Sequence, residues 1–292
     1  MDVIGLPLLL ASLRLSAPLA IAAMGELVAE RAGVLNIGIE GMMLGGAFAA
    51  FALGAVSGSV SLALCAGILA GAALAALFAL FVIGRNADPI VCGTAINVLA
   101  LGATGSGYRL LLPPGASPLT SPQMPEFAGI NAFVLIAALL VPAIALFLLR
   151  TRWGLSVRAV GERAEAAHSQ GVSVLPIRWA ASIFGGGCAG LAGASLVLWL
   201  SDTFVEGMTS GRGFIALSLV LFGGYRPLRI VAGALLFGGA SALQFRLQAM
   251  GAEIPYNLLL MTPYVLTLVV LTLLAGRVRA PADLGRPFVQ RE

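Results

Sequence analysis

Long apolar runs separated by short polar stretches dominate the chain. Each run is about 20 residues long, which is the length that an α-helix needs to cross a hydrocarbon core of about 30 Å. We place nine runs, with a range of eight to ten, near residues 4–24, 34–56, 60–84, 89–112, 130–149, 178–200, 210–225, 228–249 and 255–276. The pattern predicts an all-α, polytopic membrane protein.

The seventh of these runs is unusually short. Only 13 residues separate Arg212 from Arg226, and a helix of that length covers about 20 Å, less than the hydrocarbon core. One interpretation is a short, tilted structural helix. The other is a broken crossing, in which the preceding segment 202–211 enters the membrane as irregular backbone. Such backbone persists only where protein or a water-filled cavity satisfies its polar groups, and broken helices often line transport pathways.

The arginines predict the orientation of the chain. All 17 basic side chains are arginine, and five of them lie in the polar segment 150–178. Cytoplasmic loops of membrane proteins carry the excess of positive charge, so we expect this segment inside the cell. Alternation of nine crossings then places 13 of the 17 arginines inside, including those of the tail 277–292. The N-terminus is expected outside and the C-terminus in the cytoplasm.

Composition narrows the classes of function. The chain is 59% hydrophobic and 10% charged, whereas soluble domains carry about 25% charged residues. We expect one transmembrane domain over residues 1–292. The net charge of +4 is spread between apolar runs, which argues against a nucleic-acid surface. The absence of lysine excludes a phosphate-binding G-x-x-x-x-G-K-[ST] loop, so any ATP must bind to another polypeptide. No catalytic motif appears, and we expect neither enzyme activity nor a cofactor in this chain.

Two polar residues follow the first apolar run. Asn36 and Glu40 are four residues apart, which would place them on one face of a helix. A carboxylate at that depth is costly, so it should face the protein interior, a cavity or a partner such as Arg14. The pair either lies on or beside a permeation path or is structural. Residues 26–31, which precede it, are expected to form a polar turn at the inner face.

A further amide, Asn97, lies in the middle of the fourth run. It can bind a solute or join two helices by hydrogen bonds. Asp88 and Pro89 precede it and are expected to start that helix, with aspartate as the cap and proline at the first position. Phe214, in the short seventh run, completes our set of candidate pathway residues.

The polar segment 150–178 contains a predicted short helix. Gly161 precedes the helical stretch 162–170, and Gly171 can end it. Glu162 falls in the first turn, where the helix dipole favours negative charge. Three alanines make the surface small and smooth, which suits a peg that fits a groove on another protein. The only histidine, His168, has no second histidine or cysteine nearby, so no metal site is expected.

The chain resembles the permease subunits of ATP-binding-cassette (ABC) importers for branched-chain amino acids, simple sugars and nucleosides. It is most similar to the shorter of the two paired permeases of nucleoside and simple-sugar systems. About 40% of the length carries the resemblance. The matching stretches are GELVAERAGVLNIGIEGMMLGGAF, ADPIVCGTAINVLALG, SVRAVGERAEAAHSQGV, GRGFIALSLVLFGGYRP and PYVLTLVVLTLLAGRVRAPADLGRPF. The resemblance implies the helical body of a type II importer.

The resemblance also implies a coupling loop, in which a G-x-x-x-x-A-A-x-x-x-G sequence docks into a cleft of the ATPase. It maps to Gly161, Ala166, Ala167 and Gly171, with Glu162 and Arg163 between them. The implied partners are an ATPase that holds ATP and magnesium, a second, longer permease and an extracytoplasmic solute-binding protein, with the chain itself embedded in the lipid of a bacterial cytoplasmic membrane. The implied function is to form half of the pathway for a nucleoside or a simple sugar. An ion-coupled secondary transporter, a branched-chain amino acid permease, and a membrane enzyme or scaffold without flux remain as alternatives.

Overall fold

The computed structural model describes residues 5–112, 119–127, 130–250 and 279–288, with the isolated helical positions 261, 265, 269 and 272. The α-helices are α1 (Leu6–Arg31), α2 (Ile39–Ser57), α3 (Val60–Val82), α4 (Pro89–Leu111), α5 (Ala132–Arg150), α6 (Arg152–Glu162), α7 (Ala164–Ser169), α8 (Val174–Ser195), α9 (Arg212–Phe222) and α10 (Pro227–Ala249). A π-helical turn, Leu196–Leu200, continues α8. Two short strands, β1 (Glu126–Phe127) and β2 (Ile130–Asn131), pair antiparallel.

Seven helices in the described part of the chain are long and apolar enough to cross a membrane: α1, α2, α3, α4, α5, α8 with its π-turn, and α10. The prediction of an all-α polytopic membrane protein is therefore confirmed, with seven long crossings rather than about nine. The seventh expected run contains only the 11-residue helix α9. The ninth, 255–276, lies outside the described residues except for four helical positions.

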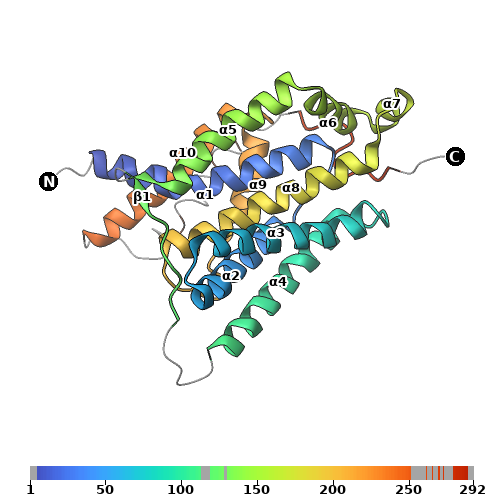
Figure 1. Ribbon diagram of the computed structural model, residues 1–292. Coiled ribbons are helices and arrows are strands. Elements are labelled where there is room, and N and C mark those ends of the chain that lie inside the picture. Colours follow the sequence, from blue (N-terminus) through green and yellow to red (C-terminus); the bar gives the residue numbers. More distant parts are fainter. Residues whose placement is uncertain are drawn as a thin grey trace.

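Helices α1 and α8 lie at the centre of the bundle: α5 and α10 pack on α1, α2 and α3 pack on α8, and α4 lies outside them against α2 (Figure 1). Every residue of α1 from Ser16 to Glu30 is buried. Glycines let α8 approach α3 closely, because a Cβ atom on Gly71 would lie 2.7 Å from the Cα of Gly190. In lipid there is no hydrophobic drive for helices to associate, so they are held together largely by the close van der Waals packing that small residues allow.

The inner end of α1 corrects one expectation. Glu26 and Glu30 do not form a polar surface turn, since α1 continues to Arg31 and both carboxylates are fully buried. The reason is that α1 lies inside the bundle, in contact with α5, α8, α9 and α10. Arg31, at the helix end, donates from Nη2 to the carbonyl of Tyr225 at 3.0 Å and lies 3.9 Å from Glu162.

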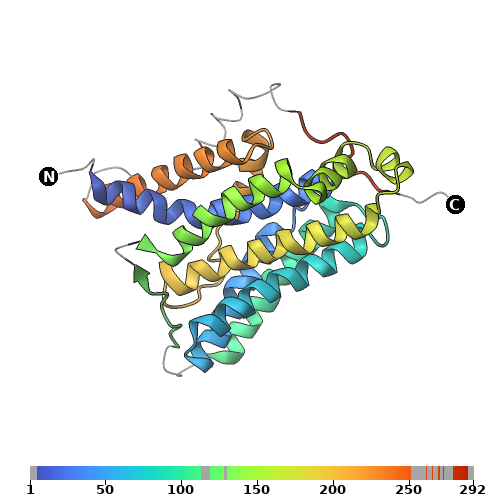
Figure 2. The same cartoon turned by 45° about the horizontal axis from the view of Figure 1, so that its top comes forward.

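The polar segment 150–178 forms two helices at the end of the bundle opposite the start of α1 (Figures 1 and 2). It was expected to contain one helix over 162–170. The structure instead ends α6 at Glu162 and begins α7 at Ala164, because Arg163 takes an extended conformation between them. The last arginine of the segment, Arg178, already belongs to α8. The described part of the C-terminal tail, 279–288, returns to this same end (Figure 1).

Candidate functional site

The link between α1 and α2 holds Asn36 in a turn. Gly33, with a φ of 85°, ends α1, and α2 does not begin before Ile39. Asn36 is fully buried; its backbone N–H donates to Oε1 of Glu26 at 3.3 Å, and its Oδ1 accepts from the N–H of Gly38 at 3.1 Å. The expectation that Asn36 and Glu40 share a helical face is therefore wrong, because only Glu40 is part of the helix.

Glu40 binds the start of α9. Its Oε1 accepts from the N–H of Gly211 and its Oε2 from the N–H of Gly213, both at 2.7 Å. The first N–H groups of a helix have no partner within the helix and carry its positive dipole end, so they stabilise an anion. Glu40 also lies in the first turn of its own helix, α2. Arg14, considered as its partner, lies instead 3.2 Å from Glu126.

This contact requires glycine at position 213. A Cβ atom there would lie 2.6 Å from the Cα and 2.7 Å from the backbone N of Glu40. The obstacle is backbone rather than a flexible side chain, so α9 could not approach α2 with any larger residue. The two short hydrogen bonds of the carboxylate depend on this approach.

The segment before α9 is irregular backbone, and the short seventh run itself forms the helix α9, so each interpretation of that run matches one observed feature; entry of the segment into the membrane stays a prediction. Residues 201–211 contain turns and no regular helix. Phe204 holds the segment against the bundle, since its ring lies 5.3 Å from that of Phe48 and 5.5 Å from that of Tyr108. Thr209 is also buried. Phe204 and Thr209 thus anchor the stretch on the bundle, whereas Asp202, Val205, Glu206 and Ser210 are exposed.

Asn97 joins α4 to the start of α2. Its Oδ1 accepts from the N–H of Gly41 at 2.7 Å, and its Nδ2 donates to the carbonyl of Ile37 at 3.0 Å. Asp88 caps α4 as expected, accepting from the N–H groups of residues 90 and 91. Asn97 is the ninth residue of α4, which places it about 12 Å along the helix from its start.

A pocket of about 290 Å³ lies where these groups meet. It is lined by Glu40, Gly41 and Leu44 of α2, by Asn97, Val98 and Leu101 of α4, and by Gly207, Thr209 and Ser210 of the irregular segment. Two of the four candidate pathway residues, Glu40 and Asn97, thus line one pocket. Asn36 is fully buried and Phe214 is half-exposed on α9, and neither is among the lining residues. Sequence reasoning missed Thr209 and Ser210, for which the only signal was the turn-rich composition of 202–211.

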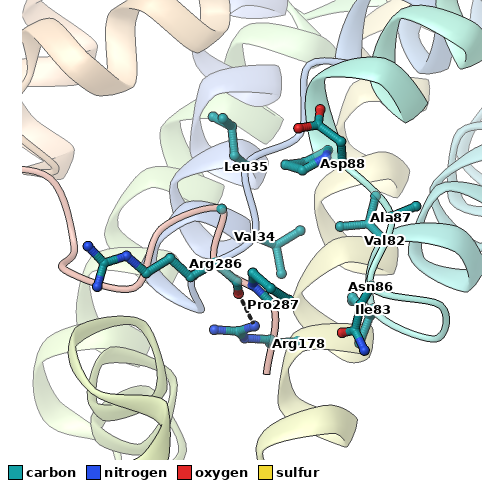
Figure 3. A pocket seen from close by; sticks show the side chains of 13 residues that line it. Val34, Leu35, Val82, Ile83, Asn86, Ala87, Asp88, Arg178, Arg286 and Pro287 are labelled. Carbon is teal, nitrogen blue, oxygen red and sulfur yellow. Dashed lines mark hydrogen bonds between the residues drawn. The ribbon is translucent and has the colours of Figure 1, made fainter. Parts of the chain in front are cut away.

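A second pocket, of about 250 Å³, lies at the end of the bundle that holds α6 and α7 (Figure 3). The α1–α2 link contributes Val34 and Leu35, the α3–α4 turn contributes residues 86–88, and the tail contributes residues 285–287. At its base, Nη1 of Arg178 donates to the carbonyl of Arg286 at 2.8 Å. None of the site residues expected from the sequence lines this pocket.

The expected coupling residues divide between two faces of the α6–α7 pair. Glu162, Arg163, Ala166 and Gly171 are exposed, whereas Gly161 and Ala167 are buried. Ala167 packs in a small apolar cluster with Val160, Ala164, Val174 and Phe288. Gly171, with a φ of 84°, ends the turn after α7 and donates to the carbonyl of His168 at 2.8 Å. The exposed residues form the outer surface, and the buried ones hold it against the bundle.

Known proteins share this sequence over nearly its whole length. Residues 8–274 match the family described as branched-chain amino acid transport system / permease component. The chain is 41% identical to the putative glucose ABC transporter permease protein TsgC13 of Haloferax volcanii, over 86% of this chain and 80% of the relative. It is 34% identical to the guanosine ABC transporter permease protein NupQ of Bacillus subtilis, over 96% and 95%.

A third relative, the nucleoside ABC transporter permease protein NupC of Lactococcus lactis, is 30% identical over 94% of each chain. These relatives are named as permease components and not as catalytic subunits, which agrees with the lack of an enzyme motif. The long apolar helices, the pocket between α2 and α4 and the family match lead to one conclusion. The chain belongs to the branched-chain amino acid transport system permease family and is a multi-pass permease subunit of an ABC transporter.

Proposed function

We propose that this chain is the shorter permease of a heterodimeric, ATP-driven importer and forms half of the pathway for a nucleoside or a simple sugar. The α6–α7 pair carries the proposal, because it presents a short helical surface for another protein at one end of a bundle of membrane-crossing helices. The names of the relatives, which include glucose, guanosine and nucleoside permeases, supply the class of solute.

In this proposal the ATPase docks on the exposed face of α6 and α7. Glu162, Arg163 and Ala166 contact its cleft, and the buried Gly161 and Ala167 seat the two helices on the permease. In this proposal the chain lies in a bacterial cytoplasmic membrane, with the arginine-rich segment 150–178 in the cytoplasm, as the distribution of positive charge favours, and the N-terminus outside. ATP drives the cycle through its different affinities for the outward-open and inward-open states. ATP and magnesium stay on the ATPase.

The α2–α4 pocket forms this chain's part of the solute pathway. Each carboxylate oxygen of Glu40 accepts one backbone hydrogen bond, and the other polar side chains of the lining, those of Asn97, Thr209 and Ser210, are uncharged. The lining includes no cationic side chain, although the carboxylate of a free amino acid would call for one. This favours a nucleoside or a sugar over a branched-chain amino acid.

The remaining partners follow from the same geometry. The exposed apolar residues Val98 and Leu101 of α4 border the pocket, and they are where the second, longer permease would close the pathway. A solute-binding protein would deliver its solute at the opposite end from α6 and α7, where α8 finishes in its π-helical turn.

Uptake into liposomes tests the proposal. The permease is reconstituted with the second permease, the ATPase and the binding protein that its genome encodes, and uptake of labelled guanosine, glucose and leucine is measured with and without ATP. We expect ATP-dependent uptake of guanosine or glucose that survives collapse of the proton gradient. Uptake that continues without the ATPase and stops with the proton gradient would show a secondary transporter instead.

A further inference from the structure

The described part of the C-terminal tail, residues 279–288, forms a strap across the inner end of the bundle. Backbone hydrogen bonds attach the strap at two points. The N–H of Asp283 donates to the carbonyl of Gly161 at the end of α6, and the N–H of Gly285 donates to the carbonyl of Gly33 in the α1–α2 link, both at 3.0 Å. Arg178 at the start of α8 adds a third attachment through the carbonyl of Arg286.

Asp283 supplies the cap that α7 lacks. The residue that precedes α7, Arg163, makes no side-chain cap, and α7 is only six residues long. Its first N–H, that of Ala164, donates instead to Oδ2 of Asp283 at 2.8 Å, although the two residues are 119 positions apart. A single isolated helical turn and a half is unstable in water, and a carboxylate at the N-terminus favours it through both hydrogen bonding and the helix dipole.

Phe288 packs against the buried face of α7. Its side chain is buried in the cluster that contains Ala164 and Ala167, and its ring lies 5.6 Å from that of His168 in an edge-to-face arrangement. The strap therefore contacts α7 at its first residue and along its buried face. Because Ala164 and Ala167 are small, the helix comes close to the ring, and the position of α7 depends on the strap.

We propose that the strap is the positioning element that fixes α7 on the permease and passes the movement of α6 and α7 to the α1–α2 link. The inference rests on the proposed function, in which an ATPase moves these helices. The chain of contacts runs from Asp283 through Gly285 to Gly33, seven residues before Glu40, which binds α9 at the pocket. The pocket of about 250 Å³ lies beside the strap, and residues 86–88 of the α3–α4 turn line its opposite wall (Figure 3). The strap is therefore separated from these residues by open space and not by packed side chains.

Two substitutions of Asp283 test the role of the strap in the complete reconstituted importer. Asp283→Ala removes the acceptor for the N–H of Ala164, whereas Asp283→Asn keeps an oxygen at that place and serves as the matched control. We measure ATPase bound, ATP hydrolysed and solute transported, each per assembled complex. For Asp283→Ala we expect bound ATPase to remain while transport per ATP falls about fivefold to tenfold, the equilibrium effect of losing one helix cap. Asp283→Asn keeps the hydrogen bond but loses the charge that favours the N-terminus of α7, so it should fall between Asp283→Ala and the wild type.

A second variant keeps the test independent of one residue. Phe288→Ala leaves Asp283 intact and removes the support beneath α7, so it should reduce transport per ATP in the same way. Wild-type transport per ATP in both alanine variants would overturn the role of the strap. A wild-type importer without ATP-dependent uptake would overturn the proposed function itself, which separates the two failures.

Discussion

Replacing Glu40 with alanine is the sharpest test of the α2–α9 contact. The substitution removes both acceptors of the N–H groups of Gly211 and Gly213. Interhelical hydrogen bonds in membrane proteins are worth about 0.6 kcal/mol each on average, and a charged partner roughly doubles that value. Two such bonds give about 2.5 kcal/mol, or roughly a 60-fold change in the fraction of molecules with α9 docked on α2.

Glu40→Gln should give an intermediate effect. Its amide oxygen can accept from one of the two N–H groups, but its NH₂ group would face the other donor. Glu126→Ala is the control, because Glu126 forms a half-exposed ion pair with Arg14, and such pairs contribute about 0–1 kcal/mol. Reconstituted uptake and thermal unfolding in detergent are measured for all three variants. Wild-type uptake and unfolding temperature in Glu40→Ala would refute the reasoning.

Three further predictions follow from single positions. Gly213→Ala should lose uptake because its Cβ would meet the backbone of Glu40, whereas Gly102→Ala, with no atom within 4 Å of its Cβ, should keep it; equal uptake in both would contradict the close approach. A cysteine at the exposed Ser169, in a chain without its native cysteines, should escape an impermeant reagent added to intact cells, and labelling would place α7 on the wrong side of the membrane. A glutamate at the exposed Ala166 should prevent co-purification of the ATPase while the permease still inserts into the membrane; an unchanged yield of ATPase would remove α7 from the docking surface.

The sequence alone determined the class of the protein and most of its crossings. Hydropathy over 20 residues is a local property, and a membrane leaves a run such as 60–84 few alternatives to a spanning helix. The cap at Asp88 and the tight turn at 57–59 are local too, since each depends on neighbouring residues. The sequence also singled out Glu40 and Asn97, because a polar side chain inside an apolar run is conspicuous without any structure; their role in a solute pathway stays a prediction.

Only the tertiary structure decided what those groups contact. The carboxylate of Glu40 meets N–H groups 171 and 173 positions away, and Asp283 caps a helix 119 positions before it. The buried position of Glu26 likewise depends on which helices surround α1. Helical periodicity relates residues three or four apart, whereas these contacts arise from the way whole helices pack, and that packing is set by many small side chains together.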